Sequence, residues 1–158
     1  MVIREAGILF RGFSLTSASY HKTTDEQIDG DLRSGLLTAL VNFAESIFSS
    51  HTVEYFEMKK YIIAFMDENI KPADSPHPER LISYAIMDKL SSQKKIEKTI
   101  YKVIQPSLKK IIYKFKSMYD GKNLSHISQF KDFKTELDII FGSDTKTVDQ
   151  KLKGTFFK

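Results

Sequence analysis

Thr23 to Ser50 reads TTDEQIDGDLRSGLLTALVNFAESIFSS, and this stretch predicts a long helix with two apolar faces. Thr24 with Gln27 matches a capping box, and the acidic residues of the first turns favour the positive end of the helix dipole. At about 100° per residue, one apolar stripe is made by Ile28, Leu32, Leu36, Ala39, Phe43 and Ile47. A second stripe beside it is made by Leu37, Val41, Ala44 and Phe48. One helix therefore has two faces to bury.

The second stripe is the candidate partner-binding surface. The first stripe is typical of a helix side that packs on a sheet, whereas the second needs a partner molecule or a cover from the chain's own loop or tail. A strand predicted at 53–58 (VEYFEM) follows the helix and carries Val53 and Tyr55 on one side. We assign the partner-binding role to Leu37, Val41, Ala44, Phe48, Val53 and Tyr55.

Outside this helix, the apolar pattern predicts five strands and two more helices. The strands are predicted at Ile3–Phe10, Ser14–His21, Val53–Met58, Tyr61–Met66 and Leu81–Met87. A helical period runs from Gln93 to Tyr119, and Pro106 inside it predicts a kink or a break near Lys102 to Gln105. The last helix is predicted to begin at a Ser125 or Ser128 cap and to end at Gly142.

Two segments are predicted to be irregular. Residues 68–80 hold three of the four prolines and predict a long, mobile connection between two strands, either a functional loop or a tolerated insertion. Residues 143–158 are polar and irregular, which predicts a loosely held tail. We therefore expect one domain at 1–142, followed by this tail.

The overall composition is that of a soluble globular domain. The chain has 158 residues, of which 41% are hydrophobic and 28% are charged, and it contains no cysteine, which excludes disulfides and thiolate chemistry. No apolar run approaches the roughly 20 residues that span a bilayer, and Arg4, Glu5 and Arg11 interrupt the N-terminal apolar segment. We expect a cytoplasmic protein, with peripheral membrane contact as a further option.

Positive charge is concentrated in one segment. Lys89 to Lys122 contains ten lysines against Glu97 and Asp120, a balance of +8 within a chain whose formal net charge is +4. The candidate basic surface is made by Lys94, Lys95, Lys98, Lys102, Lys109 and Lys110. These lysines either solvate the outer side of a helix or bind an acidic partner or an anionic membrane. A nucleic acid is a weaker option, because arginine is scarce and few tyrosines lie among the lysines.

The sequence does not bring together the groups that catalysis or metal binding requires. The four histidines are far apart and none has a neighbour at metal-ligand spacing. The glycines form no phosphate-binding loop, and no G-x-S-x-G motif is present. We therefore expect a protein that is not an enzyme and that binds no cofactor or metal.

The order of the predicted elements resembles the longin family over roughly residues 2–142. IREAGILFRGFSLTSASY, at 3–20, looks like the first hairpin of longin domains, and DLRSGLLTALVNFAESIF, at 31–48, looks like their first helix. The resemblance implies an α+β fold of the order β-β-α-β-β-β-α-α: a longin-like α/β/α sandwich whose five-stranded antiparallel sheet has one helix on one face and two on the other. The proline-rich connection looks long for the family, and the tail has no counterpart in it.

The resemblance also implies a function through binding. Longin-like domains serve in trafficking adaptors and in assemblies that recruit or regulate small GTPases, often by pairing with another longin or roadblock domain. We expect a non-enzymatic scaffold or adaptor that dimerises, with itself or with a related domain, and binds a small GTPase or a trafficking-type complex. Two alternatives remain open: a small-molecule sensor with a cavity beneath the proline-rich loop, and a peripheral binder of anionic membrane or nucleic acid through the lysine-rich helix.

Overall fold

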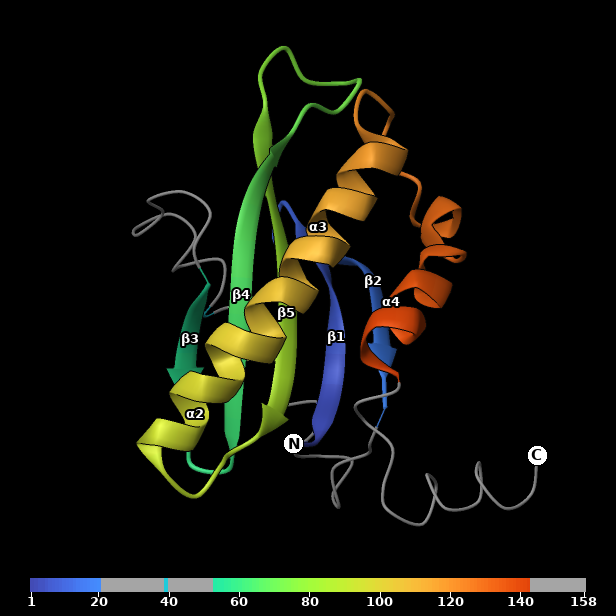
Figure 1. Cartoon of the computed structure of the whole chain (residues 1–158). Helices are drawn as coiled ribbons and strands as arrows, with labels where there is room; N and C mark the ends of the chain where they lie inside the picture. Colours follow the sequence, from blue (N-terminus) through green and yellow to red (C-terminus); the bar gives the residue numbers. More distant parts are fainter. Residues whose placement is uncertain (21–38, 40–52, 143–158) are drawn as a thin grey trace, which may run out of the picture.

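The computed structural model describes residues 1–20, 39 and 53–142, which are built around a five-stranded antiparallel sheet (Figure 1). The strands are β1 (Ile3–Phe10), β2 (Phe13–Ser19), β3 (Glu54–Glu57), β4 (Tyr61–Ile70) and β5 (Glu79–Asp88). Their order across the sheet is β2-β1-β5-β4-β3, so that β2 and β3 form its two edges. The predicted α+β class and five-stranded antiparallel sheet are confirmed. The helix predicted at 24–50 lies outside the described residues except for Ala39, which is helical.

The hairpin of β1 and β2 closes through a two-residue turn. Arg11 and Gly12 both have positive φ, at 51° and 80°, as a type I′ turn requires. This backbone conformation disfavours arginine, but its guanidinium lies 4.8 Å from the centre of the Phe10 ring and forms an ion pair with Glu79. A second ion pair joins Arg11 to Asp74 at 3.2 Å. The turn is thus tied to the segment that connects β4 and β5.

The sheet is apolar on both faces, as the continuous apolar runs in β4 and β5 predict. One face packs against the described helices and carries Ala6, Ile8, Ile62, Ala64, Leu81 and Ala85 in the main core. The side chain of Ser83 lies on this face and donates a hydrogen bond to the Leu108 carbonyl at 3.1 Å. The second face is made by Leu9, Ile63, Phe65, Ile82, Tyr84 and Ile86, which are all buried.

One long helical segment crosses the sheet face that carries the main core (Figure 1). It consists of α2 (Gln93–Thr99), a π-helical turn called η1 (Ile100–Ile104) and α3 (Gln105–Tyr119). The backbone N–H of Gln105 donates to the Ile100 carbonyl, five residues back. Pro106 has no N–H and its ring crowds the preceding turn, so the wider π-turn accommodates it without ending the helix. The irregularity expected near residues 102–105 therefore takes this form.

The last helix is shorter than predicted. A 3-10 turn, η2 (Ile127–Phe130), precedes α4 (Phe133–Phe141), so the segment from Ser128 to Gly142 is not one continuous helix. Phe130 and Phe133 insert against α3, with ring centres 5.3 Å and 5.1 Å from that of Phe115. We attribute the break to this packing, because both rings face the same aromatic cluster although they lie on different elements.

The proline-rich connection differs from its prediction in length and in attachment. The strands extend to Ile70 and begin again at Glu79, so the connection comprises residues 71–78 instead of 68–80. The sequence pattern ends β4 too early because Asp67 and Glu68 are polar, yet both are buried and pair with Arg80 and Lys116 at 3.3 Å and 3.6 Å.

Backbone hydrogen bonds attach this connection to the end of α3. The N–H of Ala73 donates to the Lys122 carbonyl at 2.9 Å, and the N–H of Gly121 donates to the Lys71 carbonyl at 2.7 Å. The Asp120 carboxylate accepts from the N–H of Lys71 at 2.8 Å. The connection is therefore hydrogen-bonded at its base and ion-paired through Asp74.

Gly7 occupies a position where the sheet has no room for a side chain. A Cβ atom there would lie 2.5 Å from the Thr16 carbonyl oxygen and 2.9 Å from the Tyr84 hydroxyl, which donates to buried Glu5 at 2.8 Å. We expect Gly7→Ala to lower the free energy of unfolding by about 1–3 kcal/mol through overpacking, measured by urea denaturation. The exposed Ser19→Ala change on β2 is the control, expected within about 0.5 kcal/mol of the wild type. Equal stability of both variants would contradict this account.

The ion pairs of Arg11 lead to a pH prediction. Hydrogen bonds from Arg11 lower the pKa of Asp74 and of Glu79 below their ordinary values. Their contribution to stability is present above the ordinary carboxyl pKa and is lost as the pH falls through the lowered values. We expect Arg11→Gln to raise both pKa values, measured by carboxyl-carbon NMR titration. Lys114→Gln is the control. Unchanged Asp74 and Glu79 titrations in Arg11→Gln would refute the coupling.

Candidate binding surfaces

The predicted partner-binding residues divide into two groups. Leu37, Val41, Ala44 and Phe48 lie outside the described residues. Val53 is 4% exposed and belongs to the main core. Tyr55, on β3, is half-buried, and its hydroxyl accepts a hydrogen bond from the Gln93 amide at 3.2 Å. Burial and the nearby Glu97 carboxylate raise the pKa of Tyr55. In this structure Val53 is a core residue, and Tyr55 joins β3 to the start of α2.

The β3 edge of the sheet is short and charged. It has four residues, and two of them are Glu54 and Glu57. Lys89 lies 3.8 Å from the Glu57 carboxylate. Short length and charge are common means of protecting a sheet edge from further strand pairing. A partner that pairs with β3 would have to accommodate these carboxylates.

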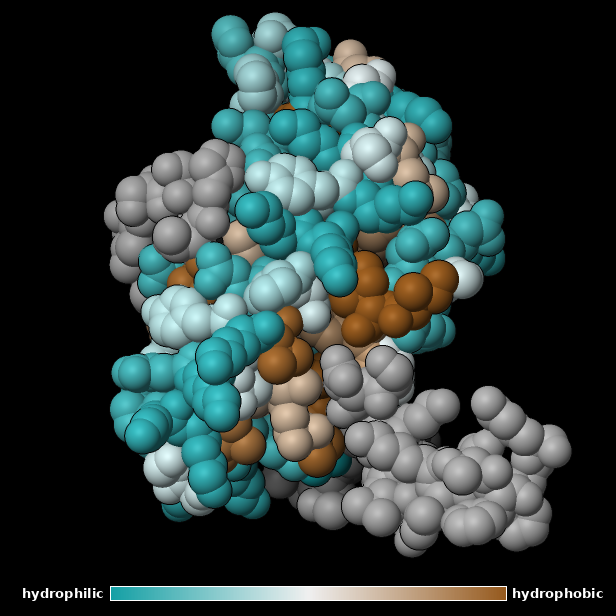
Figure 2. Space-filling view, in the orientation of Figure 1, coloured by the Kyte–Doolittle hydropathy of each residue, from teal (hydrophilic) through white to brown (hydrophobic). Residues whose placement is uncertain are grey.

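The predicted basic surface lies along the outer side of α2, η1 and α3. All six of its lysines are exposed, and none of them forms an ion pair with another described residue; they are Lys94, Lys95, Lys98, Lys102, Lys109 and Lys110. Hydrophilic residues cover much of this side of the molecule (Figure 2). Tyr101 and Tyr113 are 54% and 43% exposed among the lysines, and the Lys109 amine lies 5.9 Å from the Tyr113 ring centre. The structure thus presents uncompensated positive charge with aromatic side chains beside it.

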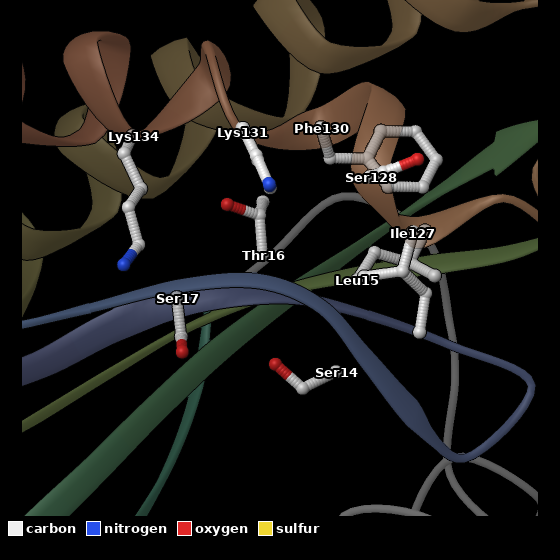
Figure 3. A pocket seen from close by; sticks show the side chains of 9 residues that line it. All are labelled: Ser14, Leu15, Thr16, Ser17, Ile127, Ser128, Phe130, Lys131 and Lys134. Atoms are coloured by element: carbon white, nitrogen blue, oxygen red, sulfur yellow. The ribbon is translucent and has the colours of Figure 1, made fainter.

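A third surface, which the sequence did not reveal, is a groove at the β2 edge (Figure 3). It has a volume of about 680 Å³ and lies along the junction at which β2 meets η2 and the start of α4. One wall is made by Ser14, Leu15, Thr16 and Ser17, and the other by Ile127, Ser128, Phe130, Lys131 and Lys134. We call it the β2 groove.

A β-bulge shapes the strand wall of this groove. Leu9 pairs with Ser14 whereas Ile8 pairs with Thr16, so Leu15 is an extra residue in β2. Leu15 and Thr16 consequently point to the same side, toward η2, while Ser14 and Ser17 point to the other (Figure 3). The amines of Lys131 and Lys134 are directed toward the strand from the opposite wall (Figure 3).

A smaller hollow of about 210 Å³ adjoins the β2 groove and shares Leu15 and Ile127 with it. Phe13 and Ile127 also line this hollow and are 69% and 57% exposed. The β2 groove therefore has an apolar end near the hairpin turn and a basic end near α4. Neither space is lined by the 71–78 connection, where a sensor cavity was expected.

The described residues contain no group of three or more His, Asp and Glu side chains that could hold a metal ion. Within the described ranges, no helix has the length and apolar character needed to cross a membrane. No protein-family model matches the chain, and no curated protein matches its sequence.

Proposed function

We propose that this protein is a longin-like binding domain that acts as a non-enzymatic scaffold or adaptor. In this proposal it pairs with a second copy or with another longin or roadblock domain, and it engages a small GTPase or a trafficking-type complex. The observation that carries the proposal is the arrangement of the described elements: two strands before residues 21–52, three strands after them, and then helices that pack on one face of the sheet.

The topology supports a helix across the second face of the sheet. β2 and β3 run in the same direction, because four antiparallel pairings separate them. At about 4.8 Å between neighbouring strands, they lie roughly 19 Å apart. A connection between parallel strands is a crossover of about a dozen residues or more, usually a helix. The apolar stripe from Ile28 to Ile47 suits the second face, which none of the described helices covers.

If the first stripe of that helix covers the sheet, the second stripe is directed elsewhere. At 100° per residue, the centre of the stripe made by Leu37, Val41, Ala44 and Phe48 lies about 140° around the predicted helix from the centre of the first stripe. We propose that they meet the partner domain, since a contiguous exposed apolar patch marks an interaction site. Tyr55 points to the opposite face of the sheet, where its hydroxyl accepts a hydrogen bond from Gln93, so it does not extend this interface.

The pairing is tested with Val41→Asp/Phe48→Asp. We expect the wild type to scatter light as a particle of about twice its 18.2 kDa, or to capture a partner domain from native extract. The double variant should weaken either association at least tenfold, because two carboxylates would be desolvated in an apolar interface. Asn42→Asp, on the polar side of the same predicted helix, is the matched control and should retain association.

Monomeric wild type at micromolar concentration, together with identical captured proteins for the wild type and Val41→Asp/Phe48→Asp, would overturn the pairing. Far-UV circular dichroism of the variants separates loss of association from loss of folding.

A second candidate function is peripheral binding to anionic surfaces through the basic surface, which the six exposed lysines favour. Each lysine near an anionic membrane contributes about 1 kcal/mol. We expect retention on phosphatidylserine vesicles at low salt, and a loss of tenfold or more in Lys109→Glu/Lys110→Glu. Lys59→Glu/Lys60→Glu changes the net charge equally at an exposed turn and is the control.

Added salt should release the wild type from the vesicles, because the interaction is between exposed charges. Absence of retention at low ionic strength, or equal loss in both double variants, would refute specific binding through this surface. The same variants, tested on a DNA duplex, separate a membrane surface from a nucleic acid.

A further inference from the structure

The two edges of the sheet differ in how they are protected. β2 is seven residues long, FSLTSAS, with neither a charged residue nor a proline, whereas β3 has four residues and two glutamates. The outer edge of β2 pairs with no strand in the described part of the chain. Its outer N–H and C=O groups are a template for another strand. The bulge at Leu15 and the neighbouring η2 and α4 modify this edge, but β2 carries neither of the two sequence devices that usually protect an edge, a charged residue or a proline. The β2 edge is therefore the one suited to strand addition.

The β2 groove provides space and charge for such a strand. Its volume of about 680 Å³ lies between the strand edge and η2 with α4. Lys131 and Lys134 are exposed, have no ion-pair partner within the described residues, and point toward β2 (Figure 3). An extended chain along β2 places alternate side chains on one side, about 6.6–7 Å apart. Acidic side chains at alternate positions would meet both amines.

The apolar end of the groove adds a second element of recognition. Leu15 and Ile127 line both the groove and the adjoining hollow of about 210 Å³, and Phe13 lies at its rim with 69% exposure. An apolar side chain of an extended peptide can enter this hollow while the following residues pass Lys131 and Lys134. The site therefore favours peptides that have an apolar residue at one end and acidic residues next to it.

The positive charge of the β2 groove disfavours a second copy of this chain as the molecule that binds there. Antiparallel pairing of β2 with the β2 of another copy would bring Lys131 and Lys134 of both copies to one place, and like charges repel. The tail at 143–158 is also a poor occupant, because it holds four lysines against two aspartates. An acidic segment of another protein fits the charge of the groove best.

We propose that the β2 groove binds an extended acidic peptide segment of another protein, which adds a sixth strand to the sheet at β2. Main-chain hydrogen bonds to β2 provide affinity, while the lysine pair and the apolar hollow provide selectivity. This site is separate from the 24–50 interface of the proposed function and does not depend on it.

The test begins with a displayed library of random decapeptides, selected on the full chain and followed by fluorescence anisotropy of the resynthesised peptides. We expect enriched peptides to lack proline and to carry Asp or Glu at alternate positions. Lys131→Glu/Lys134→Glu should weaken their binding at least tenfold. Lys59→Glu/Lys60→Glu, with the same change in net charge, should leave it within twofold.

Strand addition has its own readout. Peptides N-methylated at one set of alternate residues should lose binding, whereas those methylated at the other set should retain it, because only one set donates to β2. Val41→Asp/Phe48→Asp should bind the peptides normally, so failure of the 24–50 interface is distinguishable from failure of this site.

Three outcomes would overturn the proposal. They are a library that yields no binder, selected peptides without acidic residues or unaffected by Lys131→Glu/Lys134→Glu, and equal tolerance of both methylation patterns. A concentration-dependent dimer that the peptides displace would assign the β2 edge to a second copy instead.

Discussion

The pairing of β1 with β5 is the contact on which the sheet depends. β1 and β2 form one hairpin, β4 and β5 form another, and a two-stranded hairpin alone is marginally stable in water. Ile3 pairs with Met87 and Phe10 with Leu81, so this contact joins residues more than seventy positions apart. A bidentate ion pair between Arg4 and Asp88, at 2.7 Å and 2.9 Å, fixes one end of the pairing. α3 packs mainly on β4 and β5 and α4 on β2 and β1, so this pairing also brings the two helices side by side over one face.

Much of the fold follows from local patterns, because apolar runs and hairpin turns are encoded over a few residues. All five strands lie close to their predicted positions, and the apolar faces of β4 and β5 are buried as their composition indicates. The errors occur where a contact with a residue far away in the sequence decides the local structure. The polar residues Asp67 and Glu68 predict a loop when the local pattern is read alone. Their ion pairs with Arg80 and Lys116 instead allow them to be part of β4. The irregularity that Pro106 predicts is present, in the form of the π-turn before it.

The candidate sites show the same division. Charge density along one helix is visible in the sequence, and the lysines of the basic surface are exposed as that density indicates. The β2 groove has no comparable signal, because its walls come from residues 14–17 and 127–134. β2 is an edge strand although it carries no charged residue, and nothing in the local sequence places Lys131 and Lys134 opposite it. Val53, chosen for its strand alternation, lies just before β3 and is buried in the main core.

The π-turn at η1 sets how α2 and α3 are rotated relative to each other. One residue more or less in a helix turns everything beyond it by about 100°. Removing one residue between Ile100 and Ile104 would therefore rotate α2 relative to α3. Ile96 would leave the core, and the hydrogen bond between Gln93 and Tyr55 would be lost. Lys94, Lys95 and Lys98 would move around the axis while Lys109 and Lys110 stayed in place. The arrangement of lysines on the outer surface thus depends on the number of residues in the π-turn. A single deletion there would change that arrangement without replacing any lysine.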